Sequence, residues 1–256
     1  NLDFFKRSFQ MGSIIALISV LMVIFNGHAQ TQHMVEIQPM KIAAAEALWQ
    51  DEEPASFSLL TIGDLEQRSD VFAIRIPGVL SLLAYNNVQD EVRGIYSLQA
   101  DYEEQYGPGN YIPPVALIYW SFRAMVGSGF LMLALAFIAI FLMLGDNYAK
   151  SPRFMKVLPW AMALPYLANS AGWIMAEVGR YPWAVYGLQL LEDAISPNVG
   201  VGALLTTLIG YIAIYGILMV VDIRLLRKFA IAGPHLDEDG TKKSSKKTSN
   251  LTAGQA

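Results

Sequence analysis

Residues 115–144 read VALIYWSFRAMVGSGFLMLALAFIAIFLML, an apolar run of about 30 residues. A helix that crosses the hydrocarbon core of a bilayer needs about 20 apolar residues, so this run predicts a transmembrane helix that tilts or protrudes. Three further runs are long enough to span: Phe9–Gly27, Phe154–Ala176 and Val201–Val221. Pro159 and Pro165 predict kinks in the third of the four runs. The pattern therefore predicts an all-α transmembrane helical bundle with four spans.

Composition supports a membrane protein. The chain is 54% hydrophobic and only 16% charged, and its mean hydropathy is +0.37, whereas soluble domains carry about 25% charged residues. It has no cysteine, which excludes disulfides, thiolate-bound iron–sulfur clusters and CxxC zinc sites. The only basic cluster is a short Lys-rich tail, so nothing in the sequence predicts binding to nucleic acid.

A polar insert, residues 28–113, separates the first two runs. It holds 13 of the 22 acidic residues but only four of the 18 Lys and Arg, so it is predicted to be an acidic loop domain. Its secondary structure is predicted to be mixed and partly helical: helices over Pro39–Trp49 and Pro77–Tyr85, and strands over Ser56–Thr61 and Val71–Ile76. Residues 236–256 are of low complexity, and the tail 226–256 is predicted to be disordered.

Basic residues orient the predicted spans, because Lys and Arg favour the cytoplasmic ends of transmembrane helices. They cluster before the first run, between the second and third, and after the fourth: Lys6, Arg7, Lys150, Arg153, Lys156, Arg224, Arg227 and Lys228. The loop 28–113 is therefore predicted to be external and the tail cytoplasmic. The predicted segments are 1–27 with the first span, 28–113 as the external loop, 114–225 with three spans, and 226–256 as the tail.

The first run has a second interpretation. Lys6 and Arg7, the apolar core 13–25 and the small-x-small triplet Gly27-His28-Ala29 also fit a cleaved signal peptide. The chain starts with Asn1 rather than methionine, which favours its being part of a longer polypeptide.

Charged and aromatic residues meet at the end of the third run, where residues 172–183 read GWIMAEVGRYPW. Ionisable groups at such depth are costly and commonly face a bundle interior, a cofactor or an ion path. The alternative is a boundary, in which Glu177 and Arg180 pair at i,i+3 and Trp183 lies in the aromatic belt. Arg123, inside the second run, either has an anionic partner or extends to the nearby interface.

Other candidate residues have ordinary explanations. Met125 is one of 11 methionines, most of which fill space in a core. The three histidines are placed in loops or at interfaces, which disfavours a bis-histidine haem within the chain: His28, His33 and His235. Lys41 and Glu46 lie on a predicted helix, where such charges usually form a solvated face.

Four motifs occur in order along the chain: Lys41-Ile-Ala-Ala-Ala-Glu46-Ala-Leu-Trp49, Phe72-Ala-Ile-Arg-Ile-Pro77, Val115-Ala-Leu-Ile-Tyr119 with Phe122-Arg123-Ala-Met125-Val-Gly-Ser-Gly129-Phe130, and Gly172-Trp173 through Gly179-Arg180-Tyr-Pro182-Trp183. Taken together, they resemble the C-terminal part of subunit I of cytochrome bd-type quinol oxidases. The resemblance extends from Lys6 to about Pro234. In that family the subunit has nine membrane helices, and this chain resembles the last four.

The resemblance implies roles for individual residues. Met125 is expected to be an axial ligand of the low-spin haem b, and Glu177 a ligand of a high-spin haem. Arg123 and Arg180 are expected to neutralise haem propionates, and Trp173 is expected to lie on the electron path between haems. Two further residues of the loop, Lys41 and Glu46, bind or deprotonate the quinol.

The resemblance also implies the surroundings of the chain. The cofactors are haem b, low-spin and high-spin, and either haem d or a b-type replacement. The partners are the missing N-terminal helices of the subunit, which would supply the histidine ligand, a second oxidase subunit, ubiquinol or menaquinol, and oxygen. The expected location is the bacterial cytoplasmic membrane. The competing class is a non-enzymatic membrane protein: a transporter segment or an anchor or assembly protein.

Overall fold

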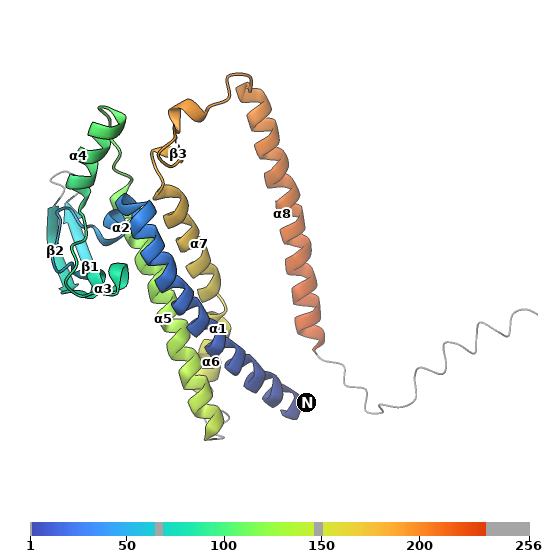
Figure 1. Ribbon diagram of the computed structural model, residues 1–256. Helices are drawn as coiled ribbons and strands as arrows, with labels where there is room; N and C mark the ends of the chain where they lie inside the picture. The colour runs from blue at the N-terminus through green and yellow to red at the C-terminus, as the bar shows by residue number, and fades with distance from the viewer. Residues whose placement is uncertain (1, 65–68, 146–150, 234–256) are drawn as a thin grey trace, which may run out of the picture. The chain divides into compact units, whose positions relative to one another are not determined.

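A computed structural model describes residues 2–64, 69–145 and 151–233 of the chain (Figure 1). The chain divides into two units, Asp3–Ile195 and Ser196–Ala256 together with the first two residues. The second unit contains one long helix, α8 (Val201–Ala232). Most of the predicted tail, residues 234–256, lies outside the described residues.

Three helices in the described part of the chain are long and apolar enough to cross a membrane: α1 (Leu2–Ile37), α5 (Val115–Leu144) and α8. The third predicted span is found as two shorter helices, α6 (Pro152–Ala161) and α7 (Leu164–Val178). The break lies between Pro159 and Pro165, the two predicted kink points, because proline lacks the N–H that continues a helix. The prediction of a helical bundle agrees with this structure, whereas a fourth continuous span is not found among the described residues.

Two of the predicted boundaries were misplaced. Helix α1 continues for ten residues beyond Gly27, so residues 28–37 extend the helix instead of opening a loop. It also runs without interruption through Gly27-His28-Ala29, the triplet that fits a cleavage site. Helix α8 likewise continues past Val221 to Ala232.

The loop domain has the mixed structure that the sequence predicts. It contains α2 (Pro39–Glu46), the antiparallel hairpin of β1 (Phe57–Asp64) and β2 (Ser69–Ile76), and α3 (Val79–Tyr85). Helix α4 (Ile95–Tyr106) was not predicted, because most of its residues are polar and only Ile95, Leu98 and Tyr102 are buried. After α7, the short strands β3 (Trp183–Val185) and β4 (Gln189–Leu190) and the 3₁₀ turn η2 (Glu192–Ala194) complete the unit.

An irregularity in β1 determines which side chains of the hairpin face inward. The register slips between Ser58 and Leu60, which leaves Leu59 as an extra residue. A bulge of this kind lets residues three apart share one face of a strand. Ser58 and Thr61 are accordingly both buried and hydrogen-bonded to each other at 2.7 Å, whereas Leu59 is exposed.

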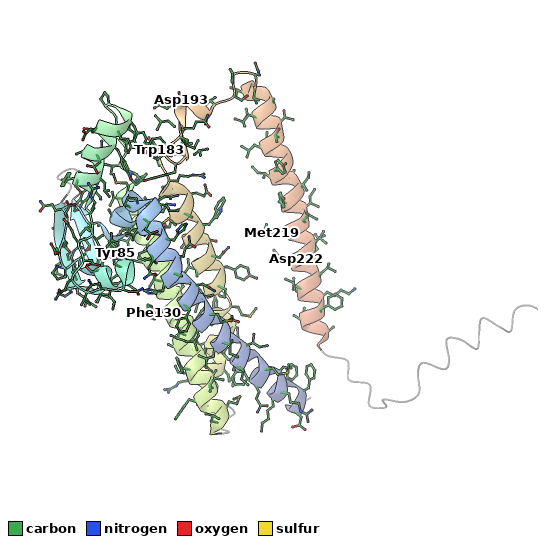
Figure 2. The ribbon with its side chains drawn as sticks, in the orientation of Figure 1. Tyr85, Phe130, Trp183, Asp193, Met219 and Asp222 are labelled. Atoms are coloured by element: carbon green, nitrogen blue, oxygen red, sulfur yellow. The ribbon has the colours of Figure 1, made fainter. Side chains whose placement is uncertain are left out.

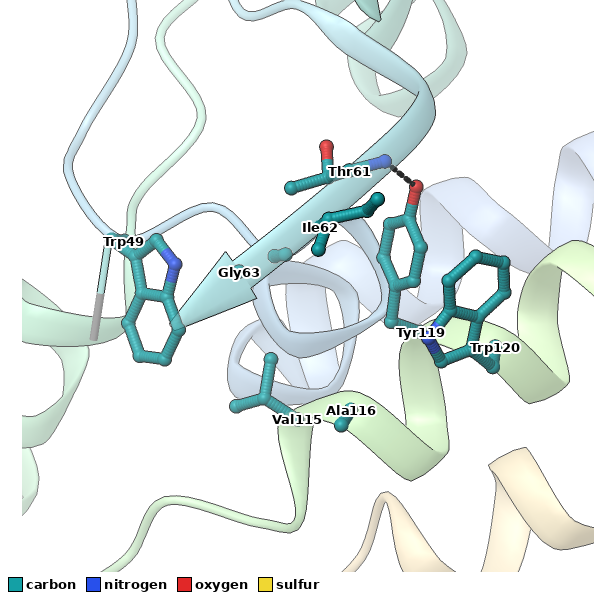
Figure 3. Close-up of a pocket in the computed structure, with 9 residues that line it drawn as sticks. Trp49, Thr61, Ile62, Gly63, Val115, Ala116, Tyr119 and Trp120 are labelled. Atoms are coloured by element: carbon teal, nitrogen blue, oxygen red, sulfur yellow. Dashed lines mark hydrogen bonds between the residues drawn. The ribbon is translucent and has the colours of Figure 1, made fainter. Parts of the chain in front are cut away.

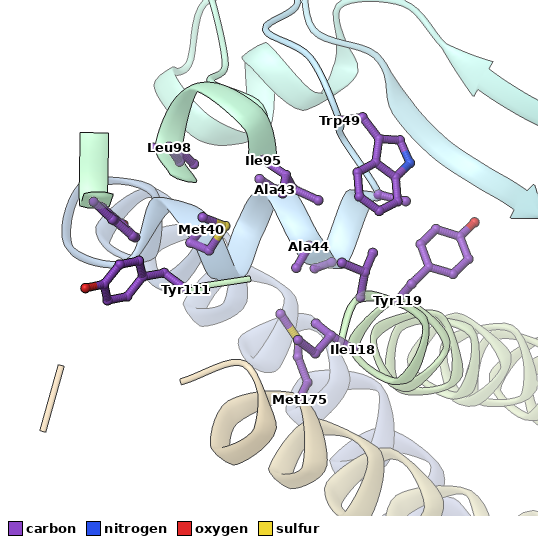
Figure 4. Packing of buried hydrophobic residues seen from close by; sticks show 14 of the residues in the cluster. Met40, Ala43, Ala44, Trp49, Ile95, Leu98, Tyr111, Ile118, Tyr119 and Met175 are labelled. Atoms are coloured by element: carbon purple, nitrogen blue, oxygen red, sulfur yellow. The ribbon is translucent and has the colours of Figure 1, made fainter. Parts of the chain in front are cut away.

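The core lies where the loop domain meets α5 and α7. Helix α2 is buried along its length and packs between α4 and the start of α5, as Figure 4 shows. Ala43, Ala44 and Ala45 are at most 1% exposed, and their small side chains allow close helix packing. The solvated face that such charges usually form is not found here, because Lys41 and Glu46 are both buried inside this core.

Candidate functional site

Glu46 and Arg123 form a buried ion pair between α2 and α5. Arg123 donates from Nη1 to Oε1 at 3.1 Å and from Nη2 to Oε2 at 2.7 Å, and the side chains are 2% and 11% exposed for Glu46 and Arg123, respectively. The backbone N–H of Ser58 also donates to Oε2, at 2.9 Å. Burial raises the pKa of Glu46 above its ordinary range, while Arg123 opposes that rise. The anionic partner that the sequence predicted for Arg123 is therefore Glu46.

Aromatic side chains enclose this pair. The Arg123 guanidinium lies 4.5 Å from the ring centre of Tyr119 and 4.9 Å from that of Phe57, distances at which a cation is attracted to a ring face. The Tyr119 hydroxyl lies 2.8 Å from Ser58 Oγ and accepts the Thr61 N–H at 2.6 Å. The hairpin is thereby fixed to α5 within two turns of Arg123.

A pocket of about 120 Å³ lies between β1 and the first turns of α5, as Figure 3 shows. Tyr119 and Thr61 line it, together with Trp49 and Ala47 at the end of α2. The Trp49 indole N–H is buried and has no hydrogen-bond partner among the described residues. The volume is comparable to the cavity of about 150 Å³ that holds a benzene molecule in an engineered protein, so the pocket is large enough for one six-membered ring.

Lys41 connects the loop domain to the end of α7. Its ammonium group donates to the Ala176 carbonyl at 3.0 Å, one of the carbonyls that a helix C-terminus leaves unpaired. The aliphatic stem crosses Gly179, where a Cβ atom would lie 2.7 Å from Lys41 Cγ. Burial lowers the pKa of Lys41, Arg180 lowers it further, and Glu177 acts in the opposite direction.

We expect the Lys41→Met variant to lose part of the pH dependence of stability. The pKa of Lys41 in the folded chain lies below the ordinary value of 10.5, so between these two values the unfolded chain binds more protons. The free energy of unfolding of the parent protein should then rise with pH in this window. Thermal unfolding of both proteins from pH 7 to 10.5 measures the difference, and parallel curves would contradict the expectation.

Two predicted residues stand on an exposed face of α7. Trp173 is 69% exposed, and Glu177 lies one turn further along with its side chain 46% exposed. Arg180 Nη2 donates to Glu177 Oε2 at 2.6 Å, so the i,i+3 pair is present. Both residues are therefore accessible to a group bound against this face.

Trp183 is not in an exposed belt. It is 5% exposed and stacks on Tyr111 with ring centres 5.6 Å apart, and Figure 2 shows it beyond the end of α7. Tyr106 and Tyr186 also lie against it, at 4.8 and 5.9 Å. This aromatic cluster was not predicted, although the repeated tyrosines of 102–111 were an available signal.

Met125 packs against α7. Its side chain is half-buried, and a Cβ atom placed on Gly172 would lie 2.8 Å from Met125 Sδ. The absence of a side chain at Gly172 therefore leaves the space that the thioether occupies. Met125 lies two residues from Arg123 on α5, so the ion pair and the thioether share one region of the helix.

Substituting Gly172 by alanine is expected to push Met125 aside and to destabilise the protein by about 1–3 kcal/mol, the usual cost of overpacking. Gly127→Ala is the matched control, because a Cβ atom there meets nothing within 4 Å. Thermal unfolding of the two variants compares them directly. Equal stabilities would show that the Met125 side chain moves without cost.

Sequence comparisons place these residues in a known family. The family model described as "Cytochrome bd terminal oxidase subunit I" matches residues 1–234. Cytochrome bd ubiquinol oxidase subunit 1 of Bacillus subtilis (strain 168) is 40% identical over 242 residues, which are 93% of this chain and 52% of that protein. Cytochrome bd-II ubiquinol oxidase subunit 1 of Escherichia coli (strain K12) is 27% identical over 285 residues, covering 89% of this chain and 55% of that protein.

A solved structure agrees with these relatives. The bd oxidase from Geobacillus thermodenitrificans superposes with a TM-score of 0.67 at 26% sequence identity, covering 90% of this chain and 49% of that chain. This chain thus spans about half the length of the proteins that it matches. With a family match over 234 of 256 residues, the chain belongs to the cytochrome bd terminal oxidase subunit I family.

Proposed function

We propose that this chain forms the C-terminal half of the haem-bearing subunit of a bd-type oxidase, which oxidises a membrane quinol and reduces oxygen to water. The main support is that residues expected at the quinol contact residues expected at the haems. Glu46, expected at the quinol, is bonded to Arg123, expected at a haem, and Lys41 is bonded to the last turn of α7, which carries Glu177. A quinol site and a haem site would therefore adjoin each other.

The side chains present fit haem groups. Met125 supplies a thioether and Glu177 a half-exposed carboxylate; thioethers bind haem iron and carboxylates bind iron in other protein sites. The Nε–H of Arg123 is buried without a partner among the described residues, which leaves one donor for a propionate. Bound haem would supply one-electron and oxygen chemistry, and Met ligation would raise its potential to suit electrons from quinol.

The chain's own residues would handle the proton of the quinol. Burial raises the pKa of Glu46, which makes its carboxylate a stronger base than an exposed one. Oε1 of Glu46 accepts one hydrogen bond and Oε2 accepts two, so Oε1 has the capacity to take the proton. The pocket beside Trp49 and Tyr119 provides room for the quinol ring, and a ring oxygen there would satisfy the Trp49 N–H.

The proposed setting follows the family and the charge pattern. The protein would lie in the bacterial cytoplasmic membrane with the 28–113 loop external and the tail cytoplasmic. An apolar cavity of about 600 Å³ between α1, α5, α6 and the first turn of α7 offers space for apolar side chains of a further helix of the same subunit. A second subunit, ubiquinol or menaquinol, oxygen, and haem d or a b-type replacement complete the proposal.

Quinol-dependent oxygen uptake by the complete oxidase tests this function. General-base catalysis contributes about 10²–10⁴-fold, so Glu46→Gln should lower the rate at least about 100-fold while haem content stays unchanged. In the parent enzyme the rate should fall as the pH drops through the raised pKa of Glu46, because the protonated carboxyl accepts no proton. A membrane anchor or transporter would show no quinol-dependent oxygen uptake in any variant.

A further inference from the structure

The lengths of α1 and α5 define the depth at which they leave a bilayer. Helix α5 has 30 residues and is about 45 Å long, whereas a hydrocarbon core of about 30 Å takes about 20 residues. Counting 20 residues from its Leu144 end reaches Met125, so 115–124 protrude. On α1 the apolar run ends at Gly27 and the polar segment 28–37 protrudes by a similar length.

The loop domain touches both protruding segments at their lower ends. The ring of Phe57, at the base of the hairpin, lies 4.9 Å from the guanidinium of Arg123. On the other span, His28 Nε2 and Asn86 Oδ1 at the end of α3 are 2.8 Å apart. These two contacts, made to different helices, lie at the same calculated depth, next to the surface of the bilayer.

The uncovered surface at the base of the loop domain, which is the open end of the hairpin and α3, exposes apolar side chains. Four side chains near these contacts are each 41–50% exposed: Leu59, Ile74, Ile76 and Leu82. Ile76 is the register partner of Phe57, and Leu82 lies one turn before Asn86. Figure 1 shows α3 and the open end of the hairpin at one end of the loop domain, with α4 at the opposite end.

Acidic side chains lie at the far end of the domain. Helix α4 exposes Asp101, Glu103 and Glu104, as expected for a surface in water. The hairpin also exposes Ile62, Val71 and Phe72 towards its turn, so the exposed apolar face extends beyond the base.

We propose that the base of the loop domain, formed by Leu59, Ile74, Ile76 and Leu82, is seated in the phospholipid interface of the bilayer. The occupant of this apolar face is lipid, because the two contacts to α1 and α5 hold it at the depth of the headgroups. The inference depends on the membrane spans and is independent of the proposed quinol oxidation and of the haem ligands.

Spin labelling tests the proposal, and the chain has no cysteine of its own. Leu82→Cys and Ile76→Cys would each carry a nitroxide, and Glu104→Cys on α4 would be the water-exposed control. The complete oxidase, with cysteines of its other chains replaced, would be placed in phospholipid nanodiscs. Collision rates with oxygen and with a water-soluble nickel chelate report the surroundings of each label.

Labels at Leu82 and Ile76 should collide readily with oxygen and several-fold less with the nickel chelate than the label at Glu104. Nickel accessibility equal to that of Glu104 would overturn the proposal, because it would place the base in water. Protection from both oxygen and nickel would also overturn it and would indicate a protein chain over this face. None of these outcomes depends on the haem content or the turnover rate of the protein.

Discussion

Replacing Glu46 by alanine is expected to destabilise the folded protein by about 3–5 kcal/mol, the usual cost of leaving one charge of a buried pair without its partner. Arg123 is 11% exposed and directs both Nη groups at Glu46, so the variant retains a cation that water barely reaches. Ser58 N–H also loses its acceptor. Chemical or thermal unfolding of purified protein measures the loss.

Two controls separate burial from charge. Asp101→Ala removes a carboxylate from an exposed pair with Arg93, for which little change in stability is expected. The double variant Glu46→Leu with Arg123→Met removes both buried charges and should recover most of the stability, as replacement of buried pairs by apolar residues often does. Equal effects of Glu46→Ala and Asp101→Ala would contradict the buried pair.

Substituting Met125 by leucine is expected to remove one haem per complete oxidase, because leucine fills a similar volume but has no sulfur to bind iron. The change in stability of the surrounding helices should be small, since Met-to-Leu exchange in a core usually costs less than about 1.5 kcal/mol. Haem content per protein, determined after extraction of the haem, measures the loss.

Met132→Leu is the matched control, since Met132 is also half-buried and lies two turns further along α5. It should retain the full haem content. A Met125→Leu protein with unchanged haem would show that this thioether is a packing group, which is the ordinary role of methionine in a core.

The helical character of the chain was predictable because length and apolar composition determine a membrane span. The runs at 115–144 and 201–221 needed no partner to be recognised, and both are found as helices. The break between α6 and α7 was predictable only as a kink, because proline shows where a hydrogen bond is lost but not how far the chain turns.

The buried charges were not predictable from local sequence. Glu46 and Arg123 are 77 residues apart, and Lys41 and Ala176 are 135 residues apart, so no local pattern pairs them. A lysine and a glutamate on a short helix usually face water, and only the resemblance to a family assigned them a role. The contact between Ser58 and Tyr119 was also not predictable from local sequence. It depends on a bulge in β1 that brings Ser58 onto the inner face of the hairpin.

The most direct measurement is the dithionite-reduced minus oxidised visible spectrum of the complete oxidase that contains this chain. The parent, Met125→Leu and Glu177→Ala proteins would be compared in the same membranes. The proposal predicts that Met125→Leu loses the low-spin haem b bands and that Glu177→Ala alters the high-spin features selectively. Identical spectra of all three inserted proteins would contradict the assignment of Met125 and Glu177 as iron ligands.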